Sequence, residues 1–324
     1  MQLGKLNIKN KLILAPISMF SDIGLRRVCY DYGAGYAFTE RIYAKELIAA
    51  KRQIKRKLDF YDEVGLQLLT NNPQELIQAI KIVNEKQIYP NLVNIRSVDL
   101  NLGCPTRELI RQNMGAALLD RPQLIRELFR AMRKSTELPV SAKIRLALNP
   151  KHKKTKPYLQ IAKMAEEEGL DFITVHARDA LQMYSGTVDY YALKEIKEQT
   201  KIPIVGNGGI TNEETAQKML RLCDAAMIGQ QAIHSPFIFK QVEHYINTGK
   251  KLEININEEK RRCIIKYFEY AKQYDIGFQR LKIHMQSFLK GMPNSGNIIG
   301  KLTSTKNKEE LKRLVEPHLS GFRS

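Results

Sequence analysis

Short apolar runs recur along the first 230 or so residues, and longer amphipathic stretches separate them. The runs are continuous, which is typical of strands that are buried on both faces of a parallel sheet. We predict eight such strands, at residues 11–16, 35–39, 64–69, 97–101, 140–145, 171–176, 202–206 and 224–229.

Amphipathic stretches of helical length lie between the runs, for example at 73–85, 122–135 and 157–169. Each of these begins with Pro, and the last ends with Gly, as helix boundaries prefer. Eight strands that alternate with helices predict an α/β fold, a closed (β/α)8 TIM barrel within residues 1–243. An open doubly wound sheet is the alternative. It usually has a GxGxxG turn after its first strand, and LAPISMF (14–20) has none.

The pattern changes after about residue 245, where helical stretches remain at 258–274, 277–290 and 306–316. From residue 245 on, sixteen Lys and Arg stand against eight Asp and Glu, a net charge of +8. We predict a small, basic, all-helical domain over residues 244–324. A helical extension packed under the barrel is the alternative.

The charge of the whole chain indicates a polyanionic partner. Its 324 residues include 52 Lys and Arg against 34 Asp and Glu, which gives a formal charge of +18 and a pI near 9.6. Nucleic acid is the leading partner, because neutralising phosphates releases counterions and rewards many cations.

The spacing of the four cysteines and the hydropathy of the chain indicate the cellular compartment of the protein. Cys29, Cys104, Cys223 and Cys263 lie far apart with no CxxC pair, which favours neither a disulfide framework nor a zinc site. No apolar run reaches the length of a membrane span, about 18 residues, and the first residues lack the apolar stretch of a signal peptide. We therefore expect a cytoplasmic protein with no bound metal and no membrane contact.

A barrel of this kind collects its chemistry in the loops at the C-terminal ends of its strands. The polar residues at those ends, from six different strands, are Gln67, Asn101, Cys104, Lys143, His176, Arg178, Asn207 and Gln230. We expect them to converge on one site.

Two features indicate what this site binds. Alternation along SAKIR (141–145) directs Lys143 and Arg145 to one face, and a lysine on a buried strand is better explained by a ligand than by the core. Glycines follow the last two strands in IVGNGGI (204–210) and MIGQQA (227–232), where barrels often bind phosphate. A phosphorylated ligand is therefore expected.

Cys104 lies between Gly103 and Pro105, directly after the fourth strand. A protonated thiol at this position can act as a general acid. A nucleophile and an inert loop thiol are the competing roles, and the lack of an adjacent base in the sequence weighs against the nucleophile.

Taken in order, LAPISMFSD, TER, VGLQLL, VDLNLGCP, NMGAALL, AKIR, VHARDALQMYSG, PIVGNGGI and AAMIGQQA resemble the tRNA-dihydrouridine synthases. The resemblance covers about residues 1–240 and continues into RLKIHMQSFLKGMPNS (280–295), which is similar to the family's tRNA-facing helical segment. It implies an FMN enzyme that reduces the C5=C6 bond of a uracil in tRNA with NADPH or NADH.

Carried over residue by residue, the resemblance implies these roles. Cys104 would be the proton donor. FMN would be held by Pro16, Ile17, Ser18, Gln67, Asn101, Lys143, His176, Asn207, Gly208, Gly209, Gly229 and Gln230. The uracil or the tRNA would meet Asn101, Arg107, Arg145 and Arg178.

The chain departs from the family pattern at four places. Gly209 stands where the family usually has Asp, Gln230 where it usually has Arg, and Arg41 where it usually has an apolar residue, while Ala177 in place of a usual Gly is a small change. The FMN phosphate would then be held by backbone amides and other cations.

The implied mechanism transfers hydride from reduced FMN to C6, and Cys104 then protonates C5. Lys143 would stabilise the anionic reduced flavin, and the uracil must leave its stack to reach it. The basic domain would bind the tRNA, aided by the runs KRQIKRK (51–57) and KHKKTK (151–156), Arg107 and Arg111. We expect a monomer.

Two other functions stay open from the residues. One is a flavin barrel that acts on a free pyrimidine, similar to a dihydroorotate dehydrogenase, although such a substrate needs no basic tail. The other is a non-catalytic RNA-binding barrel.

Overall fold

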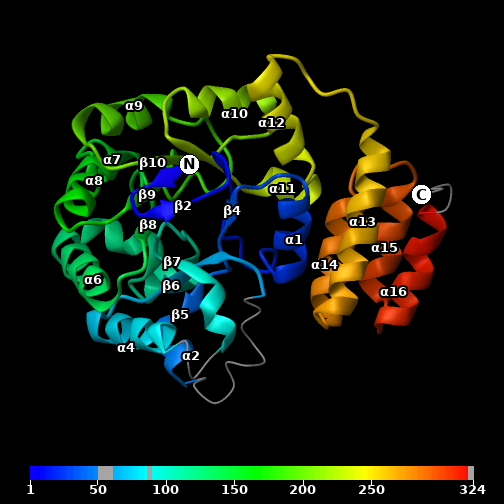
Figure 1. Ribbon diagram of the computed structural model, residues 1–324, viewed down its shortest axis with the longest axis horizontal. Helices are drawn as coiled ribbons and strands as arrows, with labels where there is room; N and C mark the ends of the chain where they lie inside the picture. The colour runs from blue at the N-terminus through cyan, green and yellow to red at the C-terminus, as the bar shows by residue number, and fades with distance from the viewer. Residues whose placement is uncertain (50–60, 86–89, 320–324) are drawn as a thin grey trace.

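The computed structural model describes residues 1–49, 61–85 and 90–319, which form a barrel with a helical domain beside it (Figure 1). In these ranges a parallel sheet of nine strands has the order β4-β3-β11-β10-β9-β8-β7-β6-β5. The strands are β3 (Leu12–Leu14), β4 (Tyr36–Ala37), β5 (Ile42–Tyr43), β6 (Val64–Leu69), β7 (Ile95–Leu102), β8 (Val140–Arg145), β9 (Phe172–His176), β10 (Ile204–Asn207) and β11 (Ala225–Ile228).

The sheet closes into a barrel at its second strand position. Phe38, just after β4, pairs with Gly65 of β6, and Ile42 of β5 pairs with Leu68 of the same strand. β4 and β5 are therefore two segments of one position, and the chain between these pairings is one residue longer than the matching stretch of β6, as in a β-bulge. The closed ring has eight positions, which confirms the (β/α)8 barrel. Its second position consists of β4, inside the predicted strand at 35–39, and β5, which lies beyond that strand.

A small antiparallel hairpin that the sequence patterns did not predict, β1 (Gln2–Leu3) with β2 (Leu6–Asn7), lies at the N-terminal end of the barrel. Its Leu3 belongs to the apolar cluster that fills the barrel interior, together with Phe38 and Phe172. The N-terminal end is thus closed by apolar packing, which leaves the C-terminal end for polar chemistry.

Helices surround the barrel, and the predicted helices at 73–85, 122–135 and 157–169 are confirmed as α4, α6 and α8 (Figure 1). The barrel helices and short turns are α1 (Ile23–Asp31), α2 (Ala44–Ala49), α4 (Pro73–Asn84), η2 (Pro90–Asn94), α5 (Arg107–Arg111), η3 (Gly115–Asp120), α6 (Pro122–Ser135), α7 (Pro150–Lys153), α8 (Pro157–Glu167), α9 (Tyr190–Gln199), α10 (Glu213–Leu220), α11 (Gln230–His234) and α12 (Ile238–Thr248).

The chain leaves the barrel after α12. This helix packs on α10 and ends at Gly249, whose φ of 71° suits a helix C-terminus. The expected domain boundary at residue 243 falls inside α12, because this helix still belongs to the barrel wall.

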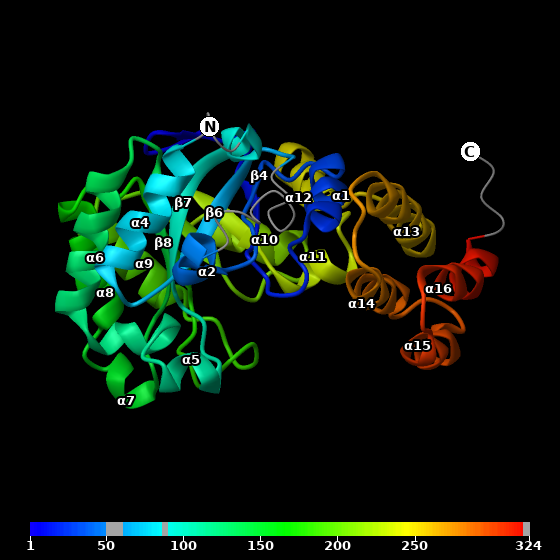
Figure 2. The same ribbon diagram turned by 90° about the horizontal axis from the view of Figure 1, so that it is seen from below.

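The remaining helices form a separate bundle beside the barrel, so the extension packed under the barrel is not what the chain forms (Figures 1 and 2). They are α13 (Ile256–Gln273), α14 (Phe278–Leu289), α15 (Ser295–Ser304), α16 (Lys308–Val315) and the turn η4 (Glu316–His318). α15 was not predicted, since two glycines and few strong helix formers disguise it in the sequence.

The bundle docks through α13 against α1 and through α14 against α11. Gly24 of α1 makes the close approach possible: a Cβ there would lie 2.6 Å from Cδ1 of Ile276 and 2.7 Å from the Tyr267 ring. No helix in the described part of the chain is long and apolar enough to cross a membrane.

Candidate active site

A chain of hydrogen bonds crosses the barrel below its C-terminal mouth. Asp99 of β7 accepts from Ser141 Oγ at 2.6 Å and from Gln67 Nε2 at 2.8 Å. The Gln67 carbonyl accepts from Asn101 Nδ2 at 2.8 Å, and Asn101 Oδ1 in turn accepts from the Cys104 N–H at 3.0 Å. Because a carboxylate only accepts, Asp99 sets which way both amides point.

Asp99 is fully buried, and burial raises its pKa to about 6, although hydrogen bonds from Ser141 and Gln67 and the charge of Lys143 oppose the shift. The two amides keep one N–H each for another partner, since each NH₂ group has used one hydrogen in this chain. Gln67 and Asn101 are therefore oriented donors at the mouth.

The loop that carries Cys104 is fixed on both sides. The Cys104 carbonyl accepts from the N–H of Ala116 at 3.0 Å, and the Gly103 carbonyl accepts from Arg145 Nε at 2.9 Å. Cys104 itself is partly exposed, and its Sγ lies 3.9 Å from Thr106 Oγ1. The thiol thus stands on a rigid loop with access to the mouth.

Gly115 explains the NMGAALL motif. Its φ is +58°, and a Cβ on it would lie 2.6 Å from the carbonyl oxygen of Cys104. Only glycine lets η3 approach the cysteine loop this closely.

Cations gather around the opposite part of the mouth. Lys143 Nζ donates to Asn207 Oδ1 at 2.9 Å, and Asn207 Nδ2 donates to the carbonyl of Met227 at 2.8 Å. Arg178 lies next to His176, with its Nη1 3.3 Å from Nε2 of the ring. A guanidinium has no acceptor, so Nε2 of His176 accepts and the ring proton is on Nδ1.

Burial lowers the pKa of all four basic groups, Lys143, Arg145, His176 and Arg178. Neighbouring cations add to the effect for Lys143, whose pKa falls to about 7, and for His176, whose pKa falls well below its ordinary value. These cations repel one another. An anion that binds among them relieves this repulsion, so its binding is electrostatically favourable.

The expected phosphate turns lie beside these cations. Gly208 has a φ of +108° and Gly209 one of +67°, and a Cβ on Gly208 would lie 2.7 Å from the His176 ring. Gly229 has more room, because a Cβ on it would lie 3.8 Å from Cβ of Ala15, and Gln230 is exposed at the start of α11.

The loop after β3 completes the rim. Pro16 and Ile17 are half-buried and Ser18 is exposed. Ser21 ties this loop together, because its hydroxyl donates to the Ala15 carbonyl and accepts from the Ile17 N–H, both at 2.8 Å.

Two of the predicted substrate residues, Arg107 and Arg145, differ in their exposure and in their contacts. Arg107 is exposed on α5, free to meet a large ligand. The guanidinium of Arg145 is buried, and it bonds the carbonyls of Gly103 and Asp179 at 2.9 Å each. Arg178 also bonds a carbonyl, that of Gly186.

Exposed cations lie on the helices around the mouth. α5 and α7 project from the same end of the barrel, opposite the N-terminal hairpin (Figure 2). Arg111 is exposed there, as are Lys151 and Lys154 of the predicted run, whereas Lys153 and Lys156 pair with Asp189 and Glu195. The run at 51–57 lies outside the described residues.

Sequence reasoning missed the inner members of the site. Asp99 and Ser141 were passed over because they lie inside strands, away from the loop ends that the barrel rule singles out. Their positions two residues before Asn101 and Lys143 were the available signal, since residues two apart on a strand share a face. Nothing in the structure explains the half-buried Arg41.

Comparison with known proteins identifies the family. The family model described as dihydrouridine synthase matches residues 13–320. A tRNA-dihydrouridine synthase B of Pasteurella multocida is 32% identical over 304 residues, 91% of this chain and 88% of the relative. The protein of the same name in Shewanella oneidensis is 31% identical over 281 residues, 85% of this chain and 84% of the relative.

Solved structures agree on the fold. Morphinone reductase aligns with a TM-score of 0.53 and 13% identity over 78% of this chain and 90% of its own. A 2-naphthoyl-CoA reductase aligns with a TM-score of 0.56 and 13% identity over 75% of this chain and 51% of its own. With a family model along nearly the whole chain and relatives above 30% identity, this chain belongs to the dihydrouridine synthase family, enzymes that reduce uridine to dihydrouridine.

Proposed function

We propose that this protein reduces a specific uridine of tRNA to 5,6-dihydrouridine, with FMN as its cofactor, NADPH or NADH as reductant and Cys104 as the proton donor. The observation that carries the proposal is the mouth of the barrel. There, a partly exposed thiol lies on a loop that is hydrogen-bonded to the oriented amide of Asn101, at the same end of the barrel as the buried Lys143.

The residues present fit a flavin mononucleotide. Gln67 and Asn101 each retain a donor for the polar edge of a flavin ring. Lys143 is a cation that burial and Arg145 make costly without an anionic partner. Gly208 and Gly209 form a turn with positive φ that leaves no room for a Cβ, and glycine turns of this kind are common at phosphate sites.

When bound and reduced, FMN supplies a hydride to C6 of the uracil ring. Negative charge then develops towards C5 and O4, and C5 requires a proton. Cys104 donates it from its thiol, while Asn101 and the Ala116 N–H keep the loop in place. Lys143 stabilises negative charge at the cofactor edge, in a preorganised position set by Asn207.

The tRNA binds across the exposed cations at this end of the barrel and along the helical domain. The chain carries a formal charge of +18, and Arg107 and Arg111 are the first and last residues of α5, which begins three residues after Cys104. Phosphate contacts of this kind position an RNA, and a flipped uracil enters the mouth.

Replacing the cysteine tests the proposal. We expect Cys104→Ala to keep its FMN and its NADPH oxidation while dihydrouridine formation falls by about 100-fold or more, since a general acid contributes on the order of 10²–10⁴. Dihydrouridine is measured by mass spectrometry of nucleosides from tRNA incubated with the purified protein.

The matched control is Cys223→Ala, which removes a buried cysteine just before β11, at the end of the barrel away from the mouth. Unaltered dihydrouridine formation in Cys104→Ala would remove the thiol from the mechanism. Reduction of free uridine as fast as tRNA would instead favour a free pyrimidine as the substrate.

A further inference from the structure

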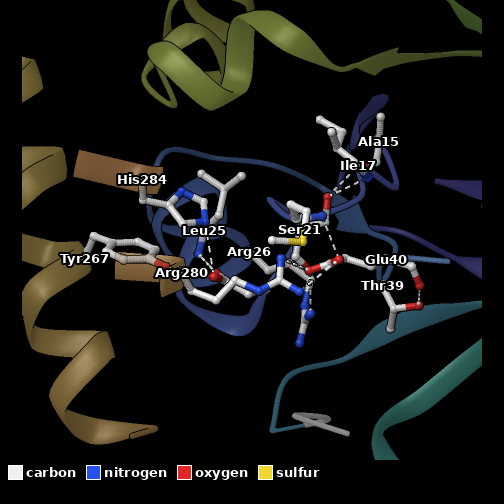
Figure 3. A network of polar contacts seen from close by, with 12 residues as sticks. Ala15, Ile17, Ser21, Leu25, Arg26, Thr39, Glu40, Tyr267, Arg280 and His284 are labelled. Atoms are coloured by element: carbon white, nitrogen blue, oxygen red, sulfur yellow. Dashed lines mark hydrogen bonds and ion pairs between the residues drawn. The ribbon is translucent and has the colours of Figure 1, made fainter. Parts of the chain in front are cut away.

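The helical domain reaches the loop at residues 15–22, which we call the cofactor loop because Pro16, Ile17 and Ser18 lie on it. Figure 3 shows this contact, with Arg280 and His284 of α14 and Tyr267 of α13 pointing at the loop and at Glu40. The barrel therefore does not build this side of the mouth alone.

Glu40 is the centre of the first contact. Its Oε2 accepts from the Met19 N–H at 2.7 Å, and its carboxylate forms an ion pair with Arg280, with 2.6 Å between Oε1 and Nη1. Arg280 Nη2 also donates to Oε2 at 3.1 Å. The side chains are only 20% and 30% exposed, so solvent screens this pair less than a surface pair.

Asp22 is the centre of the second contact, at the other end of the loop. It caps α1 by accepting from the Leu25 N–H, and it also accepts from Tyr267 Oη at 2.7 Å and His284 Nε2 at 3.1 Å. His284 is fully buried, and the ring of Phe20 meets it edge-on at 5.5 Å.

The loop needs such support. Met19 has a φ of +70°, a conformation that non-glycine residues adopt only at a cost and only where surrounding contacts impose it. The contact that acts directly on Met19 is the Glu40 carboxylate. Glu40 in turn lies in the bulge between β4 and β5, where bulges redirect side chains.

We propose that Glu40 and Arg280 position the cofactor loop, so that the helical domain is part of the cofactor site. Arg280 fixes the Glu40 carboxylate, the carboxylate fixes Met19, and the loop then presents residues 16–18 to the cofactor. The inference rests on the proposed function, because it takes FMN as the group that this loop meets.

The test compares FMN affinity, measured by quenching of FMN fluorescence, in single and double variants of the full chain. We expect Arg280→Met and Glu40→Leu each to bind FMN about tenfold more weakly, as expected for the loss of a hydrogen bond to a charged group. The double variant should bind no more weakly than Glu40→Leu, because both residues act through one carboxylate. Lys301→Met, an exposed cation of the same domain, should bind like the wild type.

Glu40→Gln separates loop positioning from domain docking. It removes the charge of the ion pair, yet it keeps an oxygen that can accept from the Met19 N–H and from the Arg280 guanidinium, so we expect it to retain most of the affinity. Equal losses in the two variants would overturn the inference, since domain docking would then explain both.

The remaining outcomes are also decisive. Wild-type affinity in Arg280→Met, with thermal unfolding as in the wild type, overturns the inference and leaves the proposed function intact. A wild-type protein that does not bind FMN overturns the proposed function, and this inference with it.

Discussion

Single residues of the site are tuned by burial more than by their partners. Lys143 has a carbonyl acceptor on Asn207 but lies among cations, and burial together with Arg145 lowers its pKa to about 7. Asp99, one layer deeper, has a pKa raised to about 6 by burial. Both residues are therefore held in conditions that disfavour their charged forms, as is common in sites that await a charged ligand.

The lysine predicts a pH-dependent stability. Its pKa is lower in the folded protein than its ordinary value of 10.5, so the unfolded chain binds the proton more tightly between pH 7 and pH 10.5. The resulting loss of stability is fully present below pH 7 and disappears as the pH rises to about 10.5. We expect Lys143→Met to stabilise the FMN-free protein by about 1–3 kcal/mol at pH 7.

Urea unfolding at pH 7 and at pH 10 measures this effect, and the gain should shrink strongly at the higher pH. Lys5→Met, an exposed lysine at the N-terminal hairpin, is the control and should change little at either pH. A stability gain of the same size at both pH values would show that folding does not lower the pKa of Lys143.

Short elements and turns place the reactive groups. η3 lies against the cysteine loop through Gly115, and the bulge between β4 and β5 directs Glu40 to the helical domain. Neither feature has a strong sequence pattern, because each depends on a contact between segments that are distant along the chain.

The turn at Gly115 makes a prediction for stability and activity together. We expect Gly115→Ala to destabilise the protein by about 1–3 kcal/mol, because alanine is strained at a φ of +58° and its Cβ would press on the Cys104 carbonyl. Dihydrouridine formation should fall as well, since the cysteine loop must move.

Gly300→Ala is the matched control. Gly300 lies inside α15 with open space around it, so alanine should stabilise the protein by about 0.4–1 kcal/mol. Both variants are compared by urea unfolding. An unchanged stability in Gly115→Ala would mean that η3 can withdraw from the cysteine loop.

At the scale of the whole molecule, the exposed cations of α5 and α7 lie at the end where the mouth opens. α5, α7 and α15 lie towards the end of the molecule where the mouth opens, while the N-terminal hairpin lies at the other end (Figure 2). A tRNA that spans the barrel and the helical domain would therefore approach from the mouth side.

This arrangement predicts the salt dependence of tRNA binding. We expect Arg107→Ala with Arg111→Ala to weaken tRNA binding and to lower the slope of log K against log salt by about 2, one for each lost phosphate contact. The affinity for FMN should not change. The pair Lys5→Ala with Lys9→Ala removes the same charge at the opposite end and should leave the slope nearly unaltered.

Filter binding of tRNA at several salt concentrations gives both slopes. Equal reductions in the two pairs would mean that the RNA responds to net charge alone, with no preferred face.

The amino-acid sequence by itself determined the periodic elements and the family. Eight apolar runs and the intervening amphipathic stretches predicted the barrel, since local hydrophobic periodicity reflects burial on two faces. Residues at strand ends, such as Lys143, His176 and Asn207, were found because the ends of parallel strands meet at one face of a barrel. Chemistry that follows from chain position and residue type was therefore predictable.

Only the tertiary structure decided the contacts between distant segments. The chain from Asp99 to Cys104 depends on how neighbouring strands are aligned, and the link from Arg280 to Met19 joins residues more than 200 positions apart. No local pattern encodes such pairings, because they arise from the alignment of neighbouring strands and from the packing of one domain against the other. The sequence thus specified which groups the site contains, and the fold specified which of them fix the others in place.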